Sequence, residues 1–553
     1  MIFSKHRAAI FPALSILVFL TLLAAPQTGW IVRTQAAHVF ARGGSLWDLE
    51  TPPTAKIPDS DYQLQLGALT GNAAQRLAQA RALRQRFPTQ ASLYANILRY
   101  DVQSKVHLPH STASDMLSSR LWSTNDKRPE STKAELDAFD RDAAAGERLD
   151  PNNAYFPAMR SIGLFASGRS AEAIAALHRA AQKTTCQDYM LDEGQGELRR
   201  REMERGRQNA IAQLSATGSR YSRHYSELHA PAHLAAKFAM QAEIAGRTNE
   251  GSQIRRDLMR LGGVMRTQSR NEDGAKIGVE IARAALLRPG GAPLNSNTDG
   301  GPPEDDLNAY CRFLTKIGHA RDIPAVRSEF ANGGEAQSIV YHVQGFDTWA
   351  LSPEWDGLTE QWIVNWTLLV NAVWLIVLGL AAMAITRVMR SEVSSTPTQR
   401  MIKMATISTI LLALALTVAP GIKAQARLLL ASVQYVSWYE NDLDWLRPDS
   451  GSNTTRILIL TAAPILLFAG CLLASLVRRK SPRTPFYQRL NRYAWPLAGV
   501  VIFAYAASVL ATIHAEYLRT MDVNAMVQNE GAYYAQWENR EWPAATAWPG
   551  DWK

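Results

Sequence analysis

The chain of 553 residues contains little cysteine and lacks the short motifs of several enzyme classes. Its three cysteines, Cys186, Cys311 and Cys471, form no Cys-x-x-Cys pair, which removes the usual sequence support for a zinc or dithiol site. It has neither the Gly-x-x-x-x-Gly-Lys phosphate loop nor the Gly-x-Ser-x-Gly turn of serine hydrolases. We therefore expect no cofactor, and the sequence favours a non-enzymatic role without deciding it. Cys186 and Cys311 could pair if both face an oxidising compartment, and this is left open because the sequence cannot show that they meet.

A group of histidines supplies the best metal hypothesis. The stretch HYSELHAPAH carries His224, His229 and His233, and histidines one helical turn apart are common zinc ligands. The His-Glu-x-x-His spacing is absent, and Pro231 favours a loop or a helix start. The alternative to a metal site is a solvated connection between two helices.

Five apolar runs approach or reach the length of about 20 residues that a bilayer-spanning helix needs. They cover residues 8–26, 361–386, 405–421, 457–477 and 493–513. The first run ends at Leu23-Ala24-Ala25-Pro26, a poor cleavage site, so we expect an uncleaved anchor rather than a signal peptide. No run has Asp, Glu, Lys or Arg at its middle, which argues against a coupled transporter.

Basic residues alternate between the loops that join these runs. Lys and Arg beside membrane spans favour the cytoplasmic face, so they set the orientation. The residues that set it follow the second and fourth runs: Arg387, Arg390, Arg478, Arg479, Lys480 and Arg483. We expect a multi-pass protein of a bacterial-type cytoplasmic (inner) membrane, with the N-terminus inside and residues 27–360 and 514–553 outside. This arrangement accounts for the net charge of +9 without a nucleic-acid partner.

Between the first two runs, apolar residues recur at the three- and four-residue spacing of packed amphipathic helices. Predicted helices cover residues 72–87, 88–103, 133–150, 233–246 and 273–287. The charged segment 191–208 is expected to form a solvated helix with local ion pairs. A Pro/Gly-rich linker at 288–306 then leads to an outer helical segment, residues 307–360, with weak periodicity after residue 323.

One stretch of this region, at 149–181, consists of two short predicted helices joined by a Gly-Arg-Ser turn. It resembles a tetratricopeptide repeat (TPR), with matches at Pro151, Gly168, Glu172, Ala173, Ile174, Leu177 and Ala180. The resemblance implies an extracytoplasmic TPR-like helical domain over residues 27–287, with the small alanines and Leu177 packed between neighbouring helices. The alternative is an irregular helical domain with one repeat-like hairpin. The expected fold class is all-α: an N-terminal transmembrane anchor, this domain and four C-terminal transmembrane helices.

Two further outer segments are amphipathic or rich in aromatic residues. Residues 422–456 contain a stretch that we expect to lie along the outer membrane surface. The tail at 514–553 carries many Tyr and Trp residues. For this tail we expect anchoring at the membrane surface or packing under the helical domain, with glycan contact as the alternative.

The resemblance implies a binding role, because stacked helical repeats present extended binding surfaces. The sequence therefore predicts a membrane-anchored scaffold, with the lipid bilayer and other envelope or membrane proteins as partners. The alternative is a subunit of an envelope polysaccharide or polymer export or assembly complex, in which the spans do more than anchor. A metal-dependent enzyme built on the three histidines is the third hypothesis.

Overall fold

The computed structural model is helical in the part of the chain that it describes. That part comprises residues 14–40, 57–108, 130–210, 213–214, 223–291, 303–345, 352–390, 469–471, 473–474 and 486–549. Within it, β-type pairing is limited to an isolated bridge between Asn153 and Thr185. The all-α fold class is therefore confirmed for these residues.

The chain divides into two compact units. One, which we call the apolar unit, comprises residues 1–51, 209–211 and 347–520. The other, the helical unit, comprises residues 52–208, 212–346 and 521–553. The predicted outer tail at 514–553 is thus mostly part of the helical unit, because residues 530–549 contact its helices.

The apolar unit contains the helices that suit a bilayer. α18 (Ser352–Arg390) includes the apolar stretch Val364–Val388, and α21 (Phe486–Gln528) includes the apolar stretch Gln488–Gln528. A bent pair, Leu14–Ala24 and Pro26–Arg33, also qualifies if the two count as one span. The described residues therefore hold two helices, or three with the bent pair, that are long and apolar enough to cross a membrane.

The structure describes three of the five predicted spans. The runs at 361–386 and 493–513 are confirmed as apolar helices of spanning length. The run at 405–421 lies outside the described residues, as does nearly all of the run at 457–477 and the loop at 422–456. The first run does not end at Pro26: the chain bends there by 99° and continues as α2 (Pro26–Phe40). Proline suits a first helical turn because it has no N–H to donate, so it starts a new helix at the bend.

The first part of the helical unit is a series of short helices. They are α3 (Tyr62–Gly67), α4 (Ala73–Arg86), α5 (Ala91–Ser104), α7 (Lys133–Leu149), α8 (Tyr155–Ala166), α9 (Ser170–Ala181) and α10 (Met190–Arg205). Consecutive helices pack on each other: α4 on α5, α7 on α8, and α8 on α9. Local chemistry explains where α4 and α7 begin, since Asn72 with Gln75 and Thr132 with Glu135 form reciprocal capping boxes.

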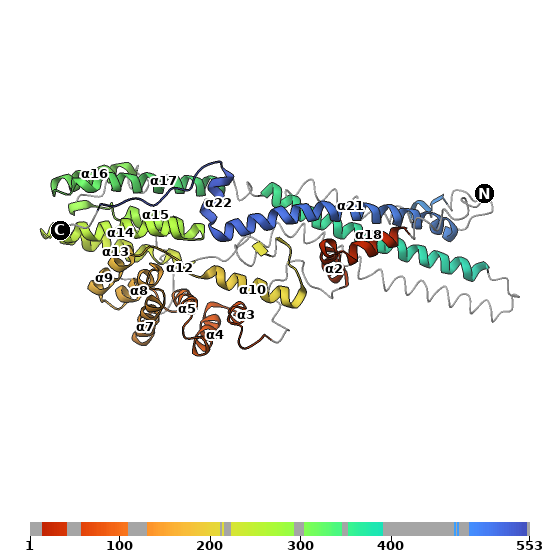
Figure 1. Ribbon diagram of the computed structural model, residues 1–553, viewed down its shortest axis with the longest axis horizontal. Helices are drawn as coiled ribbons and strands as arrows, with labels where there is room; N and C mark the ends of the chain where they lie inside the picture. Colours follow the sequence, from red (N-terminus) through yellow and green to blue (C-terminus); the bar gives the residue numbers. More distant parts are fainter. Residues whose placement is uncertain are drawn as a thin grey trace. The chain divides into compact units, whose positions relative to one another are not determined.

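The second part is built around the long helix α14. Its elements are α12 (Arg223–Ser226), α13 (His229–Ile244), α14 (Thr248–Gln268), α15 (Glu272–Ala284), η2 (Pro289–Gly291), α16 (Pro303–Lys316), η3 (Ala320–Asp322), α17 (Ile323–Gly345) and α22 (Glu530–Trp537). α14 packs against α9, α13, α15 and α17. Figure 1 shows α17 lying beside α14 and α15, and α16 packs against α17. The five helices predicted for the two parts of the helical unit are confirmed: they correspond to α4, α5, α7, α13 and α15.

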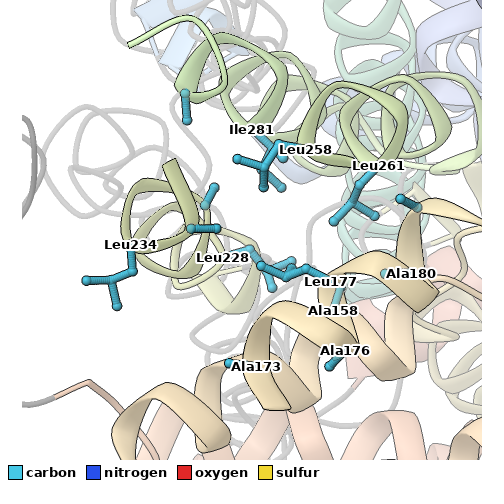
Figure 2. Packing of buried hydrophobic residues seen from close by; sticks show 14 of the residues in the cluster. Ala158, Ala173, Ala176, Leu177, Ala180, Leu228, Leu234, Leu258, Leu261 and Ile281 are labelled. Carbon is cyan, nitrogen blue, oxygen red and sulfur yellow. The ribbon is translucent and has the colours of Figure 1, made fainter. Parts of the chain in front are cut away.

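α9 joins the first part to α14 through buried apolar side chains. Leu177 and Ala180 of α9 belong to one core cluster with Leu258 and Leu261 of α14. Figure 2 shows these residues facing one another, with Leu228 close to Leu177. Small residues let α14 approach α15: a Cβ on Gly262 would lie 2.4 Å from the carbonyl oxygen of Gly278. The helical unit therefore has a continuous core whose residues come from helices between α5 and α17.

One turn type recurs between consecutive helices. Gly168, Gly246 and Gly318 precede α9, α14 and η3, with φ of 74°, 82° and 81°, a region that glycine occupies without strain. At each turn the residue after the glycine donates its N–H to a carbonyl five residues back, as Arg169 does to Leu164. The predicted Gly-Arg-Ser hairpin is therefore one of three similar helical hairpins.

Candidate functional site

Three arginines of α14 are almost completely buried. The side chains of Arg255, Arg256 and Arg266 expose 1% or less. Burying a guanidinium is costly unless carboxylates or carbonyl oxygens accept hydrogen bonds from it. The acceptors of each arginine therefore identify the segments that it binds. Arg255 holds parts of its own fold: it pairs with Glu243 and donates to the carbonyls of Ala285 and Leu287. Arg256 and Arg266 instead bind the C-terminal end of the chain.

Arg266 connects three segments that are distant in sequence. Two of its nitrogens donate to the two carboxylate oxygens of Glu329 on α17, at 3.0 and 3.1 Å. The same guanidinium donates to the carbonyl oxygens of Pro543 at 2.7 Å and Ala544 at 3.0 Å. The planar fork of arginine suits this role, because one edge binds the carboxylate while other N–H groups remain for carbonyls.

Arg256 repeats this arrangement further toward the start of α14. It pairs with Asp322 at 3.7 Å and donates to the carbonyl of Pro549. Arg256 and Arg266 are ten residues apart, which is about 15 Å along a helix. Pro543 and Pro549 are six residues apart, which spans about 19 Å in an extended polyproline-type conformation. The two spacings agree to within about 4 Å. Because Arg266 binds Pro543 and Arg256 binds Pro549, the C-terminal segment runs antiparallel to α14.

This segment, residues 538–549, is the C-terminal strap, and it has no regular secondary structure. Figure 1 shows it as the dark blue trace passing between α17 and the α14–α15 pair. Asn332 of α17, one turn after Glu329, donates to the Ala544 carbonyl at 3.3 Å and contacts the Thr546 hydroxyl at 3.1 Å. Thr546 in turn donates to Glu329 at 2.6 Å. We call Arg256, Arg266, Asp322, Glu329 and Asn332 the cradle.

Two Trp-Pro pairs carry the apolar contacts of the strap. The Trp542 indole donates to the carbonyl of Arg266 at 3.3 Å and lies against Gly531, where a Cβ would come within 2.7 Å of the ring. Trp548 packs against the main core cluster. Between the pairs, Ala544, Ala545 and Ala547 expose their side chains. The strap is therefore held by its tryptophans, its main chain and the Thr546 hydroxyl, and not by the three alanines.

The strap is introduced by α22, which is itself tied to α15. Glu530 accepts the N–H of Glu272 at 2.8 Å, at the start of α15, and the hydroxyl of Tyr534 at 2.8 Å. Burial raises the pKa of the Glu530 carboxyl. Further on, Arg540 forms ion pairs with Glu335 of α17 and with Glu538. These contacts explain why residues 521–553 belong to the helical unit. Of the two predictions for the aromatic tail, they agree with packing on the helical domain.

The three predicted metal-binding histidines lie in two helices. His224 of α12 is buried and its Nε2 is 3.3 Å from a carboxylate oxygen of Asp188. His229 and His233 lie in the first turns of α13, which begins where Pro231 favoured a helix start. Burial lowers the pKa of both to about 4. Within the described residues, no group of three or more His, Cys, Asp or Glu side chains is arranged to hold a metal ion.

The predicted repeat residues fall into two groups. Ala173, Leu177 and Ala180 are buried in the core, and Ile174 packs against it. Pro151, Gly168 and Glu172 lie instead in or beside turns, where Glu172 pairs with Arg169. Cys186 and Cys311 are separate buried thiols with no disulfide between them.

The residues predicted to set the topology are mostly untested. Arg387 is exposed near the end of α18, and Arg390 ends that helix. Arg478, Arg479, Lys480 and Arg483 lie outside the described residues. Polar side chains join the apolar helices: Asn365 of α18 donates to Thr512 of α21 at 2.7 Å, and the Trp362 indole donates to Glu516.

The charged segment 191–208 was only partly predicted correctly. Local ion pairs are present within α10, between Arg200 and Glu204 and between Arg201 and Glu197. The expectation of a solvated helix is wrong for Glu193, whose side chain is 1% exposed and pairs with Arg99 of α5. Helical periodicity cannot reveal this, because the partner is distant in sequence.

Two structural features were not predicted, although the sequence carries a signal for each. The sequence Gly-Arg-Ser-Ala-Glu at 168–172 recurs as Gly-Arg-Thr-Asn-Glu at 246–250, and each copy forms the same Arg–Glu pair across three residues. The second signal is the repeated Trp-Pro at 542–543 and 548–549.

Comparison with protein-family models, with curated proteins and with solved structures finds no match to this chain.

Proposed function

We propose that this protein is a membrane-anchored scaffold whose TPR-like helical unit binds other proteins of the cell envelope. The observation that carries the proposal is the cradle, in which buried arginines of α14 hold an extended proline-containing segment by its carbonyl groups. Holding an extended peptide is a common task of helical-repeat surfaces. The three similar hairpins and the shared Gly-Arg-Ser/Thr-x-Glu turns further support a repeat architecture.

The proposed location is the cytoplasmic membrane, with the N-terminus inside and the helical unit outside. Its support is the alternation of basic residues along the sequence together with the apolar helices α18 and α21. A reporter that is active only outside the cytoplasm should work when fused after Lys553 and fail when fused near Ser481. The reverse pattern would overturn this orientation.

Site-specific photocrosslinking in native membranes tests the scaffold role with the full chain. A photoreactive residue at Ile244, whose side chain is exposed at the end of α13, probes the helical unit. The matched position is Leu510 of α21, which is exposed on an apolar helix. We expect a reproducible protein adduct from position 244. Protein adducts only from position 510 would contradict the scaffold role and favour the polymer-export alternative, in which the spans do more than anchor.

A further inference from the structure

We propose that the cradle is a recognition site for an extended segment of a second, membrane-tethered protein that carries two Trp-Pro pairs six residues apart, and that the C-terminal strap occupies this site in cis. The inference rests on the proposed scaffold function and names the chemistry of the partner. It is carried by the match between Arg266 and Arg256 on one side and the carbonyls of Pro543 and Pro549 on the other.

The cradle recognises groups that every polypeptide carries. Arg266 and Asn332 donate to the main-chain carbonyl of Ala544, and Arg256 to that of Pro549. Recognition through the main chain requires an extended conformation but few particular side chains. A segment of another protein with the same conformation therefore presents the same acceptors.

Selectivity comes from the two Trp-Pro pairs. Proline restricts itself and the residue before it to extended conformations, and it has no N–H to bury unpaired. Pro543 is buried, and Trp542 and Trp548 supply the large apolar contacts of the strap. The exposed alanines between them place no demand on the cradle. A partner therefore needs the two pairs, their spacing and a hydroxyl at the position of Thr546, which bonds to Glu329 and Asn332.

The cradle remains electrically balanced when the strap leaves. Arg266 keeps both bonds to Glu329, and Arg256 keeps its pair with Asp322. Removing the strap therefore leaves no buried charge without its counter-ion, which is the condition that would make an empty site costly. A site built this way can exchange one extended segment for another.

The covalent connection of the strap defines what kind of partner can replace it. The strap follows directly from α22, which is bonded to α15, so it competes at an effective concentration at or above the millimolar range of short flexible linkers. A freely diffusing protein does not reach that concentration, whereas a protein confined to the same membrane approaches it. The occupant is therefore assigned to another membrane-tethered chain rather than to a soluble one.

The test uses the full chain with a protease site inserted between Asn539 and Arg540, purified in detergent and cleaved after folding. The probe is a fluorescent peptide with the sequence of residues 540–549, followed by anisotropy. We expect it to bind the cleaved protein at least tenfold more tightly than the uncleaved protein. A peptide with all four Trp and Pro residues changed to Ala should lose at least tenfold in affinity, while one with Ala544, Ala545 and Ala547 changed to Ser should bind as well as the parent.

Two results would overturn the proposal. If the cleaved protein keeps its helical circular dichroism but does not bind the peptide, or binds the parent and Trp/Pro-less peptides equally, the proposal is wrong. A second variant, the chain ending at Trp537, guards against incomplete release of the strap and should give the same ranking of peptides. Either negative result leaves the crosslinking test at Ile244 unaffected, so the two proposals fail separately.

One further measurement separates the source of the occupant. Two differently tagged full-length copies should not co-purify through residues 540–553. If they do, and if the chain ending at Trp537 abolishes it, the occupant is the strap of a second copy and the assignment to a different protein is overturned.

Discussion

Arg266 of α14 and Glu329 of α17 form a two-bond ion pair in which neither side chain is more than 2% exposed. The residues are 63 positions apart, and the pair links the helix at the centre of the helical unit to the one that borders the strap. Because Arg266 also binds the strap, the cradle depends on this ion pair to hold the Arg266 side chain in position.

Loss of the Glu329 charge should strongly destabilise the helical unit. Glu329→Gln leaves the Arg266 guanidinium buried without its counter-ion, and breaking a buried pair in this way costs about 3–5 kcal/mol. The measurement is the thermal unfolding midpoint in detergent. The control is Glu250→Gln, which removes one partner of the exposed Arg247–Glu250 pair and should cost less than about 1 kcal/mol. Equal shifts for the two variants would contradict the central role of the buried pair.

A methyl group at the closest approach of α14 and α15 should separate the helices. In Gly262→Ala the new Cβ would lie 2.4 Å from the Gly278 carbonyl oxygen and 2.8 Å from the Ala282 Cβ, so we expect a loss of about 1–3 kcal/mol. Gly334→Ala on α17 is the matched control: its Cβ meets nothing within 4 Å, and alanine favours a helix by about 0.5–1 kcal/mol. Unfolding midpoints should therefore move in opposite directions, and movement in the same direction would argue against the contact.

The turn between α8 and α9 should tolerate asparagine better than alanine. Gly168 has φ of 74° and open space around it, so backbone conformation alone decides the effect. A left-handed alanine costs about 1–2 kcal/mol, whereas asparagine enters this region more readily. Unfolding midpoints should rank wild type above Gly168→Asn and Gly168→Asn above Gly168→Ala. An alanine variant as stable as wild type would show that the hairpin does not need this conformation.

Asp101 should make the stability of the helical unit depend on pH. Burial raises the pKa of its carboxyl to about 7, and the neighbouring Arg81 offsets this only in part. Unfolded, the group has a pKa of about 3.9, so between these values the folded state binds the extra proton. The stabilisation is complete in acid and is lost as the pH rises through about 7.

The neutral variant Asp101→Asn removes this dependence. Relative to wild type, it should gain on the order of 2 kcal/mol in stability between about pH 5 and pH 8. The check is the unfolding midpoint of both proteins across that range. Asp137→Asn, which removes an exposed carboxylate of α7, is the control and should follow the wild-type pH profile. Parallel profiles for Asp101→Asn and wild type would refute the prediction.

Helix positions were predictable where local rules act alone. The range 72–87 became α4 at Ala73–Arg86, and 133–150 became α7 at Lys133–Leu149, because a capping box and an apolar stripe specify each helix within its own residues. α17 lies within the helical segment predicted at 307–360, but its bounds were not predicted, since Asn332, Gly333 and Gly334 interrupt its helical pattern. Glu329 and Asn332 bind α14 and the strap, and these tertiary contacts compensate for the weak propensity.

The amino-acid sequence by itself determined the all-helical fold of the described residues, the apolar helices of α18 and α21, and the hairpin of α8 and α9. Each depends on residues a few positions apart, so periodicity and capping reveal it. Only the tertiary structure decided that the aromatic tail lies in a cradle of buried arginines. The bonds that hold it join Arg266 to Pro543 and Arg256 to Pro549, 277 and 293 residues away. Such contacts require α14 and α17 to lie packed together, and residues so far apart in the sequence form no local pattern.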